Sequence, residues 1–245
     1  MNIIINEILG WLLITGTIIS YTPQYYKIYQ YKTSKGISEW MLIYGGLSCL
    51  FNVIASIEVN RKNIVNCNTN NDCYNVILPI IQLGTPWLTG LVFYGMYVLY
   101  YNEEMFHKIK FHGQMFIFLN LFVFLITFTV NYISFEFNSD YTLSLIYSIL
   151  SSIFCIIMWI PQIITTYNTK EEGALSLISV FIHALGCLIT IIYQTINNAS
   201  MFWVITSYVI SFVTEIGLVI LCLYYKKIKK NESLIFKALQ DENNL

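Results

Sequence analysis

Residues 21–27 read Tyr-Thr-Pro-Gln-Tyr-Tyr-Lys, and a related stretch, Trp-Ile-Pro-Gln-Ile-Ile-Thr, occupies residues 159–165, 138 positions later. Each Pro-Gln pair closes a long apolar run and precedes a short polar stretch, at 32–38 and 170–176. The same offset relates Pro23 to Pro161, Gln24 to Gln162, Lys32 to Lys170, Ser38 to Ser176 and Cys49 to Cys187. A spaced set of matches across two apolar runs predicts a duplicated unit.

The composition indicates that lipid surrounds most of the chain. Of the 245 residues, 56% are hydrophobic and only 11% are charged, and the mean hydropathy is +0.61. A soluble domain is usually about one quarter charged. The net charge of −1 gives no sign of a nucleic-acid partner.

Seven apolar runs are long enough to cross a bilayer, which takes about 20 residues each. They cover 3–29, 40–59, 76–101, 114–134, 142–167, 176–196 and 201–225. None alternates with the period of two that is typical of a barrel strand, so we expect an all-α membrane protein with seven transmembrane helices.

The lysines predict the orientation of these helices. The turns after the odd-numbered spans and the C-terminal tail are rich in lysine, whereas the other side carries only Arg61 and Lys62. The positive-inside rule therefore predicts an outer or lumenal N-terminus and a cytoplasmic C-terminus. Four spans separate the two Pro-Gln helices, so the repeats are expected to be parallel in a 3+1+3 arrangement. The expected units are 1–101 (first triple-helix repeat), 102–141 (linker helix), 142–225 (second triple-helix repeat) and 226–245 (cytoplasmic tail).

Two of the six cysteines could form a disulfide, and the spacing of the cysteines predicts no metal site. Cys67 and Cys73 share a polar loop on the predicted outer side, where they could pair. The other four cysteines lie in apolar runs, as small buried hydrophobic residues do. No Cys-x-x-Cys pair or Cys/His spacing typical of a metal site is present.

The two prolines can act as static kinks or as hinges. Pro23 and Pro161 cannot donate a backbone hydrogen bond, and each weakens the helix near its predicted cytoplasmic end. Their matching positions favour a pair of hinges. Gln24 and Gln162 have both donors and acceptors, so they could hold freed carbonyls or a partner helix in one state and release them in another.

Ionisable residues inside a membrane are costly, which makes Glu215 in the seventh span and His183 in the sixth span candidates for proton coupling. A structural hydrogen bond or simple packing is the alternative for each. Polar residues that could line a central cavity and contact a solute are Asn52, Gln82, Thr85, Thr190 and Tyr208. No P-loop, HExxH motif or nucleophile elbow is present, so neither an enzyme nor a cofactor is expected.

The two Pro-Gln stretches, with the polar segments 32–38 and 170–176, resemble the PQ-loop proteins, which include cystinosin and the lysosomal cationic amino-acid exporters. SWEET sugar carriers and KDEL receptors are more distant relatives of that fold. The resemblance implies a seven-helix carrier in a lysosomal, vacuolar or other organelle membrane that moves small solutes with protons. In cystinosin-like members an acidic residue of the sixth span takes part in proton coupling, and His183 stands at that position here.

We therefore expect a transporter of a small polar solute, in the first instance an amino acid, that works by alternating access and can be coupled to protons. The alternative is a membrane receptor or trafficking adaptor of the same fold. In that case the basic stretch 226–230 would present a cytoplasmic signal, although the same stretch is typical of an anchor on anionic lipid.

Overall fold

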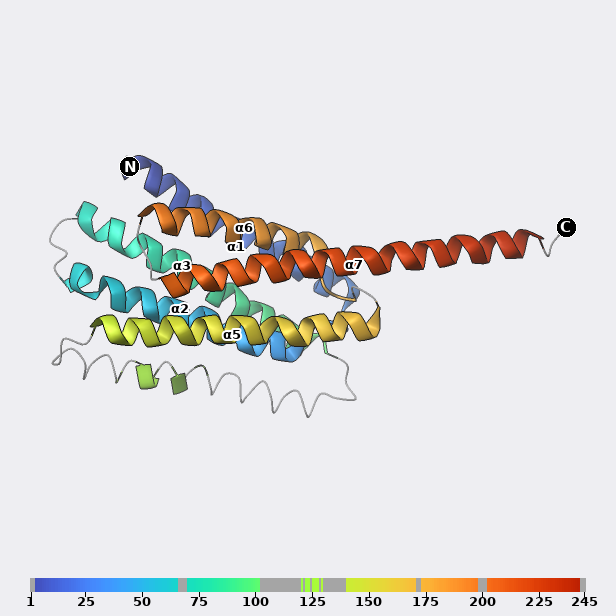
Figure 1. The fold of residues 1–245 in the computed structure, drawn as a ribbon, viewed down its shortest axis with the longest axis horizontal. Coiled ribbons are helices and arrows are strands. Elements are labelled where there is room, and N and C mark those ends of the chain that lie inside the picture. The colour runs from blue at the N-terminus through green and yellow to red at the C-terminus, as the bar shows by residue number, and fades with distance from the viewer. Residues whose placement is uncertain are drawn as a thin grey trace.

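The computed structural model describes residues 3–65, 70–101, 120, 122–123, 125–127, 129, 140–170, 173–197 and 202–242. Within this part of the chain the secondary structure is helical and contains no strand. The helices are α1 (Ile3–Tyr31), α2 (Glu39–Val65), α3 (Asn70–Leu99), α5 (Asp140–Thr169), α6 (Leu177–Asn197) and α7 (Phe202–Glu242). The predicted all-α fold is confirmed (Figure 1).

Five of the described helices are long and apolar enough to cross a membrane. The candidate spans are Glu39–Ile64, Val76–Leu99, Thr142–Thr169, Leu177–Thr195 and Val204–Lys229. The helix α1 lies beside them and has 29 residues, so at about 1.5 Å per residue it also has the length of a span. Large apolar side chains such as Trp11, Ile19 and Val213 are exposed on the outside of the bundle, as expected of a protein whose solvent is lipid.

The helices form two triple-helix bundles with the same internal packing. In the first, α3 packs against both α1 and α2, and in the second, α7 packs against both α5 and α6. The bundles meet through α2 with α5 and through α1 with α6. Since α1 corresponds to α5 and α2 to α6, the α2–α5 contact in one direction is equivalent to the α6–α1 contact in the other. This is the pattern expected of two parallel copies related by a rotation.

The α2–α5 interface is the more extensive of the two and is tightly closed. The hydroxyl of Ser48 donates to the carbonyl of Ser151, and the hydroxyl of Ser151 donates to the carbonyl of Ser48, both at 2.9 Å. Stacked aromatic rings, among them Phe51 with Phe154, continue this interface. Small hydroxyl side chains that bond a neighbouring helix are typical of close helix packing in membranes.

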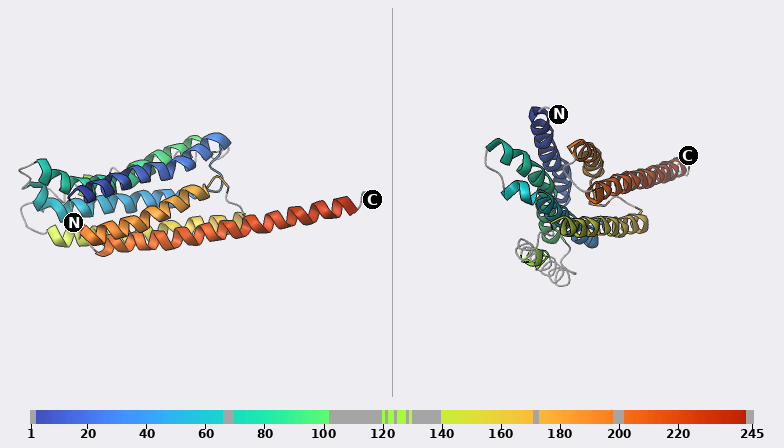
Figure 2. Two further views of the ribbon diagram at one scale, coloured as in Figure 1. Left: turned by 90° about the horizontal axis from the view of Figure 1, so that it is seen from above. Right: turned by 60° about the vertical axis from the view of Figure 1, so that its left-hand side comes forward.

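The helix α7 extends well beyond the bundle (Figure 2). Its candidate span ends at Lys229, but the helix continues to Glu242, so the segment predicted as a polar tail from residue 226 continues α7. The N-terminus lies at the opposite end of the bundle from the protruding part of α7 (Figure 1). Most of the predicted fourth span, 114–134, lies outside the described residues, and those of its residues that are described are helical.

Candidate functional site

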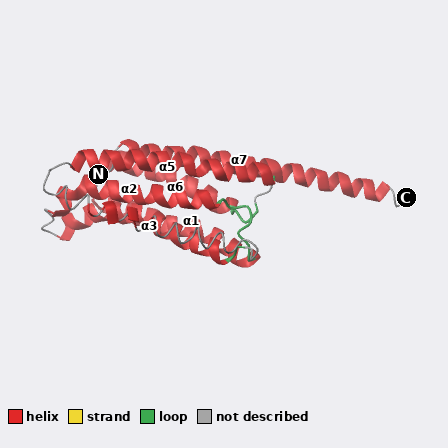
Figure 3. Cartoon of the chain, turned by 90° about the horizontal axis from the view of Figure 1, so that it is seen from below, coloured by secondary structure: helices red, strands yellow, loops and turns green. Residues whose placement is uncertain are grey.

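The two loops after the Pro-Gln helices lie together at the end of the bundle from which α7 protrudes (Figure 3). The residue directly after each helix is a lysine with positive φ, Lys32 at 48° and Lys170 at 51°. A glycine with positive φ follows in each loop, Gly36 at 92° and Gly173 at 54°. The left-handed conformation at the end of a helix redirects the chain, and glycine adopts it without steric cost. The two glycines differ in register by one position, since the offset of 138 places the counterpart of Gly36 at Ala174.

The crossing of the loops is a close backbone contact. The N–H of Ala174 donates to the carbonyl of Lys35 at 2.7 Å. A Cβ atom on Gly173 would lie 2.6 Å from that same carbonyl oxygen and 2.9 Å from Cα of Gly36. Only glycine fits at this point.

The side chains of Gln24 and Gln162 contact the crossing loops, and each forms hydrogen bonds with the loop of the other repeat. Gln24 Nε2 donates to the carbonyl of Ala174 at 2.8 Å, and the N–H of Ser176 donates to Gln24 Oε1 at 2.7 Å. Gln162 Nε2 donates to the carbonyl of Gly36 at 3.0 Å, and the N–H of Ser38 donates to Gln162 Oε1 at 2.8 Å. We call these four hydrogen bonds the glutamine latch.

The glutamine latch provides hydrogen-bond partners for carbonyl and N–H groups of the two loops, which lie outside the helices. Both side chains are almost completely buried, Gln24 with 2% and Gln162 with 0% of its surface exposed. A primary amide has its N–H donors and its carbonyl acceptor on two separate atoms, so it can bond the C=O and the N–H of one loop at once. The glutamines therefore tie the two repeats together at this end of the molecule.

Behind the latch lies a central cavity of about 140 Å³. Its lining comes from both repeats and combines aromatic, hydroxyl and amide side chains, including Tyr21, Asn52, Trp159, Ser211 and Glu215. The latch residue Gln24 also lines it. A mostly apolar cavity with a few polar groups is the usual form of a site for a small molecule.

A second cavity of about 150 Å³ lies between α1, α3, α6 and α7. It shares Ser20, Pro86, His183, Cys187 and Tyr208 with the central cavity, and it continues along α1 and α6 away from the latch. The two cavities therefore adjoin, and His183 lies where they meet.

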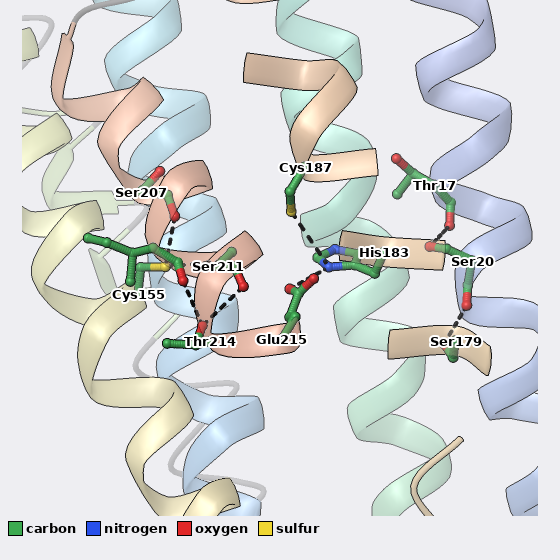
Figure 4. A network of polar contacts seen from close by, with 11 residues as sticks. Thr17, Ser20, Cys155, Ser179, His183, Cys187, Ser207, Ser211, Thr214 and Glu215 are labelled. Atoms are coloured by element: carbon green, nitrogen blue, oxygen red, sulfur yellow. Dashed lines mark hydrogen bonds and ion pairs between the residues drawn. The ribbon is translucent and has the colours of Figure 1, made fainter. Parts of the chain in front are cut away.

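At this junction the two predicted proton-coupling residues face each other across the α6–α7 interface (Figure 4). His183 Nδ1 lies 2.7 Å from Glu215 Oε1, within hydrogen-bond distance. Glu215 is completely buried, while the side chain of His183, which lines both cavities, is 28% exposed. The ring of Tyr21 on α1 packs edge-on against the imidazole at 5.8 Å between centroids. The sequence identified both residues but did not predict that they pair.

Cys187 is a third member of this group, and the sequence reasoning missed it. Its Sγ lies 3.9 Å from His183 Nδ1. Residues four apart share one face of a helix, so the spacing puts Cys187 beside His183, but nothing in the sequence distinguishes this thiol from the other cysteines in apolar runs. The thiol was instead interpreted as a small buried hydrophobe.

The structure distributes the other predicted site residues between the two cavities. Asn52 and Tyr208 line the central cavity, Gln82, Thr190 and again Tyr208 line the second, and Thr85 lines neither of these two. Pro23 and Pro161 lie inside continuous helices, α1 and α5, so their role as hinges stays a prediction. Cys67 lies outside the described residues, and its pairing with Cys73 also stays a prediction.

A comparison with known families now identifies the duplicated unit. The family described as PQ loop repeat matches residues 5–60 and again residues 143–204. This is a PQ-loop repeat protein. Each match takes in one Pro-Gln pair and the loop that follows it, so the two halves of the glutamine latch are the corresponding parts of the two PQ-loop repeats.

The fold of this PQ-loop repeat protein is that of a known transporter. The chain is similar to a solved structure described as a eukaryotic SWEET transporter, with a TM-score of 0.54 and 12% sequence identity. The similarity covers 91% of this chain and 99% of that one, so it includes both triple-helix bundles. At this identity it shows the fold alone. No curated protein matches the sequence.

Proposed function

We propose that this PQ-loop repeat protein is a carrier that moves a small polar solute across an organelle membrane by alternating access. The glutamine latch carries the proposal. It ties the two repeats together at one end, and behind it lies a cavity that both repeats line. A rotation of one bundle against the other would break the latch and open the cavity toward the end that the lysines predict to be cytoplasmic.

The energy of the latch suits such a cycle. A buried neutral hydrogen bond contributes a net of about 0.5–1.5 kcal/mol, so four of them hold the closed state by a few kcal/mol. Each 1.4 kcal/mol changes a population about tenfold. The latch is therefore strong enough to favour the closed state and weak enough to be released.

An amino acid is the first solute to test, because its polar groups match the hydroxyl and amide lining of the central cavity. Purified protein is reconstituted into liposomes, and uptake of a mixture of radiolabelled amino acids is compared with uptake of a mixture of labelled sugars. We expect uptake of the first mixture to exceed that of protein-free liposomes. If liposomes with the protein take up neither mixture faster than protein-free liposomes do, the proposal of a carrier is wrong.

The latch itself is tested with glutamine variants in the same assay. Gln24→Ala and Gln162→Ala each remove two hydrogen bonds to the opposite loop, so we expect each to shift the balance of the two states and lower uptake by about tenfold. Gln30→Ala is the matched control, because Gln30 is an exposed glutamine of the same helix α1. Unchanged uptake in both latch variants would mean that the latch does not take part in the cycle.

The predicted proton coupling through Glu215 and His183 stays a prediction beside this proposal, as does the receptor or adaptor alternative. The measurement that separates the alternative from a carrier is removal of the segment beyond the bundle, described in the Discussion.

A further inference from the structure

His183, Cys187 and Glu215 bring three different metal-ligating atoms to one point. His183 and Cys187 lie four residues apart on one face of α6, and Glu215 reaches them from α7. An imidazole nitrogen, the thiol sulfur and a carboxylate oxygen all lie within 4.8 Å of one another. The closest pair is His183 Nδ1 with Glu215 Oε1 at 2.7 Å, and Cys187 Sγ is 3.9 Å from the same nitrogen.

A second observation points to a ligand at this group. Glu215 has no exposed surface, and its other oxygen, Oε2, has no hydrogen-bond partner among the described residues. A buried carboxylate oxygen without a donor is costly, and in the interior of a membrane protein this cost is high. His183 bonds only Oε1, so Oε2 of Glu215 is available to bind a ligand.

The spacing of the three atoms is close to that of a tetrahedral zinc site. Bonds of about 2.0–2.1 Å to nitrogen, 2.3 Å to sulfur and 2.0–2.2 Å to oxygen place neighbouring ligand atoms roughly 3.3–3.8 Å apart. The separation of Sγ from Nδ1, 3.9 Å, lies just above this range. The carboxylate oxygen, now 2.7 Å from the imidazole nitrogen, has to move away from it by about 0.7 Å.

The ligand types select the kind of ion. A mixed set of nitrogen, sulfur and oxygen favours a borderline ion such as Zn²⁺ over Mg²⁺ or Ca²⁺, which take oxygen ligands. Three protein ligands also leave one tetrahedral position open. That position faces the cavities, because His183 and Cys187 line both of them and Glu215 lines the central one.

We propose that His183, Cys187 and Glu215 form a binding site for a borderline divalent cation of the Zn²⁺ class at the junction of the two cavities. The site goes beyond the proposed carriage of a polar solute and does not depend on it. It lies on the route that the cavities mark between α1, α6 and α7, so an ion bound there is reached through the same cavities.

The test uses Co²⁺ as a coloured substitute for Zn²⁺ on the purified full-length protein in detergent micelles. We expect one Co²⁺ per chain, visible d–d bands of a tetrahedral site and a near-ultraviolet thiolate-to-metal charge-transfer band, all removed by added Zn²⁺. Cys187→Ser should abolish the charge-transfer band. His183→Asn and Glu215→Gln should each weaken binding at least about tenfold, since even groups behind the ligands contribute 10–100-fold at metal sites.

Cys222→Ser is the matched control, because Cys222 is a buried cysteine on α7 that lines neither cavity. It should leave the Co²⁺ spectrum unchanged. A charge-transfer band that persists in Cys187→Ser, or a band that Cys222→Ser removes, would overturn the proposal.

A measurement on the unmodified protein covers the case in which a variant fails to fold. Maleimide labelling, mapped by mass spectrometry, reports the reactivity of each cysteine with and without Zn²⁺. We expect Zn²⁺ to protect Cys187 and to leave Cys49 unprotected, and Mg²⁺ to protect neither. Equal labelling of Cys187 with and without Zn²⁺ would overturn the site. Because no solute is present, this result is independent of whether the protein transports one.

Discussion

At the latch end of the molecule, residues at equivalent positions of the two repeats make equivalent contacts. At the centre of the molecule, the residues at equivalent positions differ in type and in contacts. Gln24 and Gln162 each bond the C=O and N–H groups of the opposite loop, at Ala174 and Ser176 in one case and at Gly36 and Ser38 in the other. At the centre, the counterpart of His183 is Gly45, and a Cβ there would already lie 3.2 Å from the sulfur of Met158.

This difference distinguishes residues required for backbone hydrogen bonding, which both repeats share, from residues that could bind a ligand, which only one repeat has. Two crossing loops present the same unsatisfied backbone groups in both repeats, so both repeats need the same amide to bond them. A binding site needs its ligating atoms only once, and a second costly ionisable pair in the membrane would gain nothing. The helix α3 accordingly has a single acidic residue, Asp72, near its first turn, whereas α7 has Glu215 in its span.

The largest expected effect comes from breaking the crossing of the loops. Gly173→Val places a β-branched side chain at a φ of 54° and against the carbonyl of Lys35, which should cost about 3 kcal/mol or more. At about 2–4 °C per kcal/mol, the Tm of the purified protein should fall by roughly 10 °C. Gly217→Ala is the control, because nothing lies within 4 Å of its added Cβ. A Tm equal to that of the wild type in Gly173→Val would refute the close crossing.

The next effect tests the symmetry of the latch directly. Gln24→Ala and Gln162→Ala each remove two hydrogen bonds to the opposite loop, so each should lower the Tm by roughly 3–10 °C. The two values should agree to within about 2 °C, because each bond of about 1 kcal/mol is matched in the other repeat. A large fall in one variant with none in the other would break the comparison.

A third prediction distinguishes a cavity residue from a structural one. Asn52 lines the central cavity, and its Oδ1 has no partner among the described residues. Asn52→Ala should therefore lower solute uptake by about tenfold, as the loss of a hydrogen bond to a solute of about 1.4 kcal/mol would. Its Tm should change by less than about 2 °C, since only one bond of 3.3 Å to Ser207 is lost.

Ser151→Ala is the counterpart of this variant at the closed α2–α5 interface. It removes the 2.9 Å bond to the carbonyl of Ser48 and lines neither cavity, so the Tm should fall by about 2–4 °C while uptake stays within about twofold. The opposite pattern in the two variants would mean that the solute passes between α2 and α5.

The smallest effect is expected from removing the end of α7 that leaves the bundle. Deletion of residues 231–245 keeps the candidate span, which ends at Lys229, so the uptake rate of reconstituted protein should stay within about twofold. Complete loss of function with normal folding would favour the receptor or adaptor alternative, with a cytoplasmic signal that extends beyond the basic stretch 226–230.

Much of the fold could be predicted because its signals are local. The apolar runs predicted the helices, and the described helix ends differ from the predicted ones by at most six residues, except at α7. That helix continues to Glu242, because nothing in the polar segment stops it. The offset between Pro23 and Pro161 predicted two parallel triple-helix bundles, and the packing of α3 and α7 confirms them.

The candidate site could be predicted only as separate residues. Glu215 and His183 were identified because an ionisable residue in an apolar run is unusual at any position. Their contact could not be predicted, because residues 32 positions apart on two helices meet only if the helices pack in one particular rotation. Cys187 was missed because a thiol in an apolar run has no distinguishing signal until the carboxylate opposite it is placed.

The sequence by itself determined that the chain is helical, that lipid surrounds it, and that one unit occurs twice, because hydropathy, charge and repetition are properties of the chain alone. Only the tertiary structure decided that each glutamine bonds the loop of the other repeat, and that histidine, cysteine and glutamate converge between α6 and α7. The physical reason is that a polar side chain can form hydrogen bonds with many different partners. The packing of helices that are distant in the sequence decides which partner lies within about 3 Å.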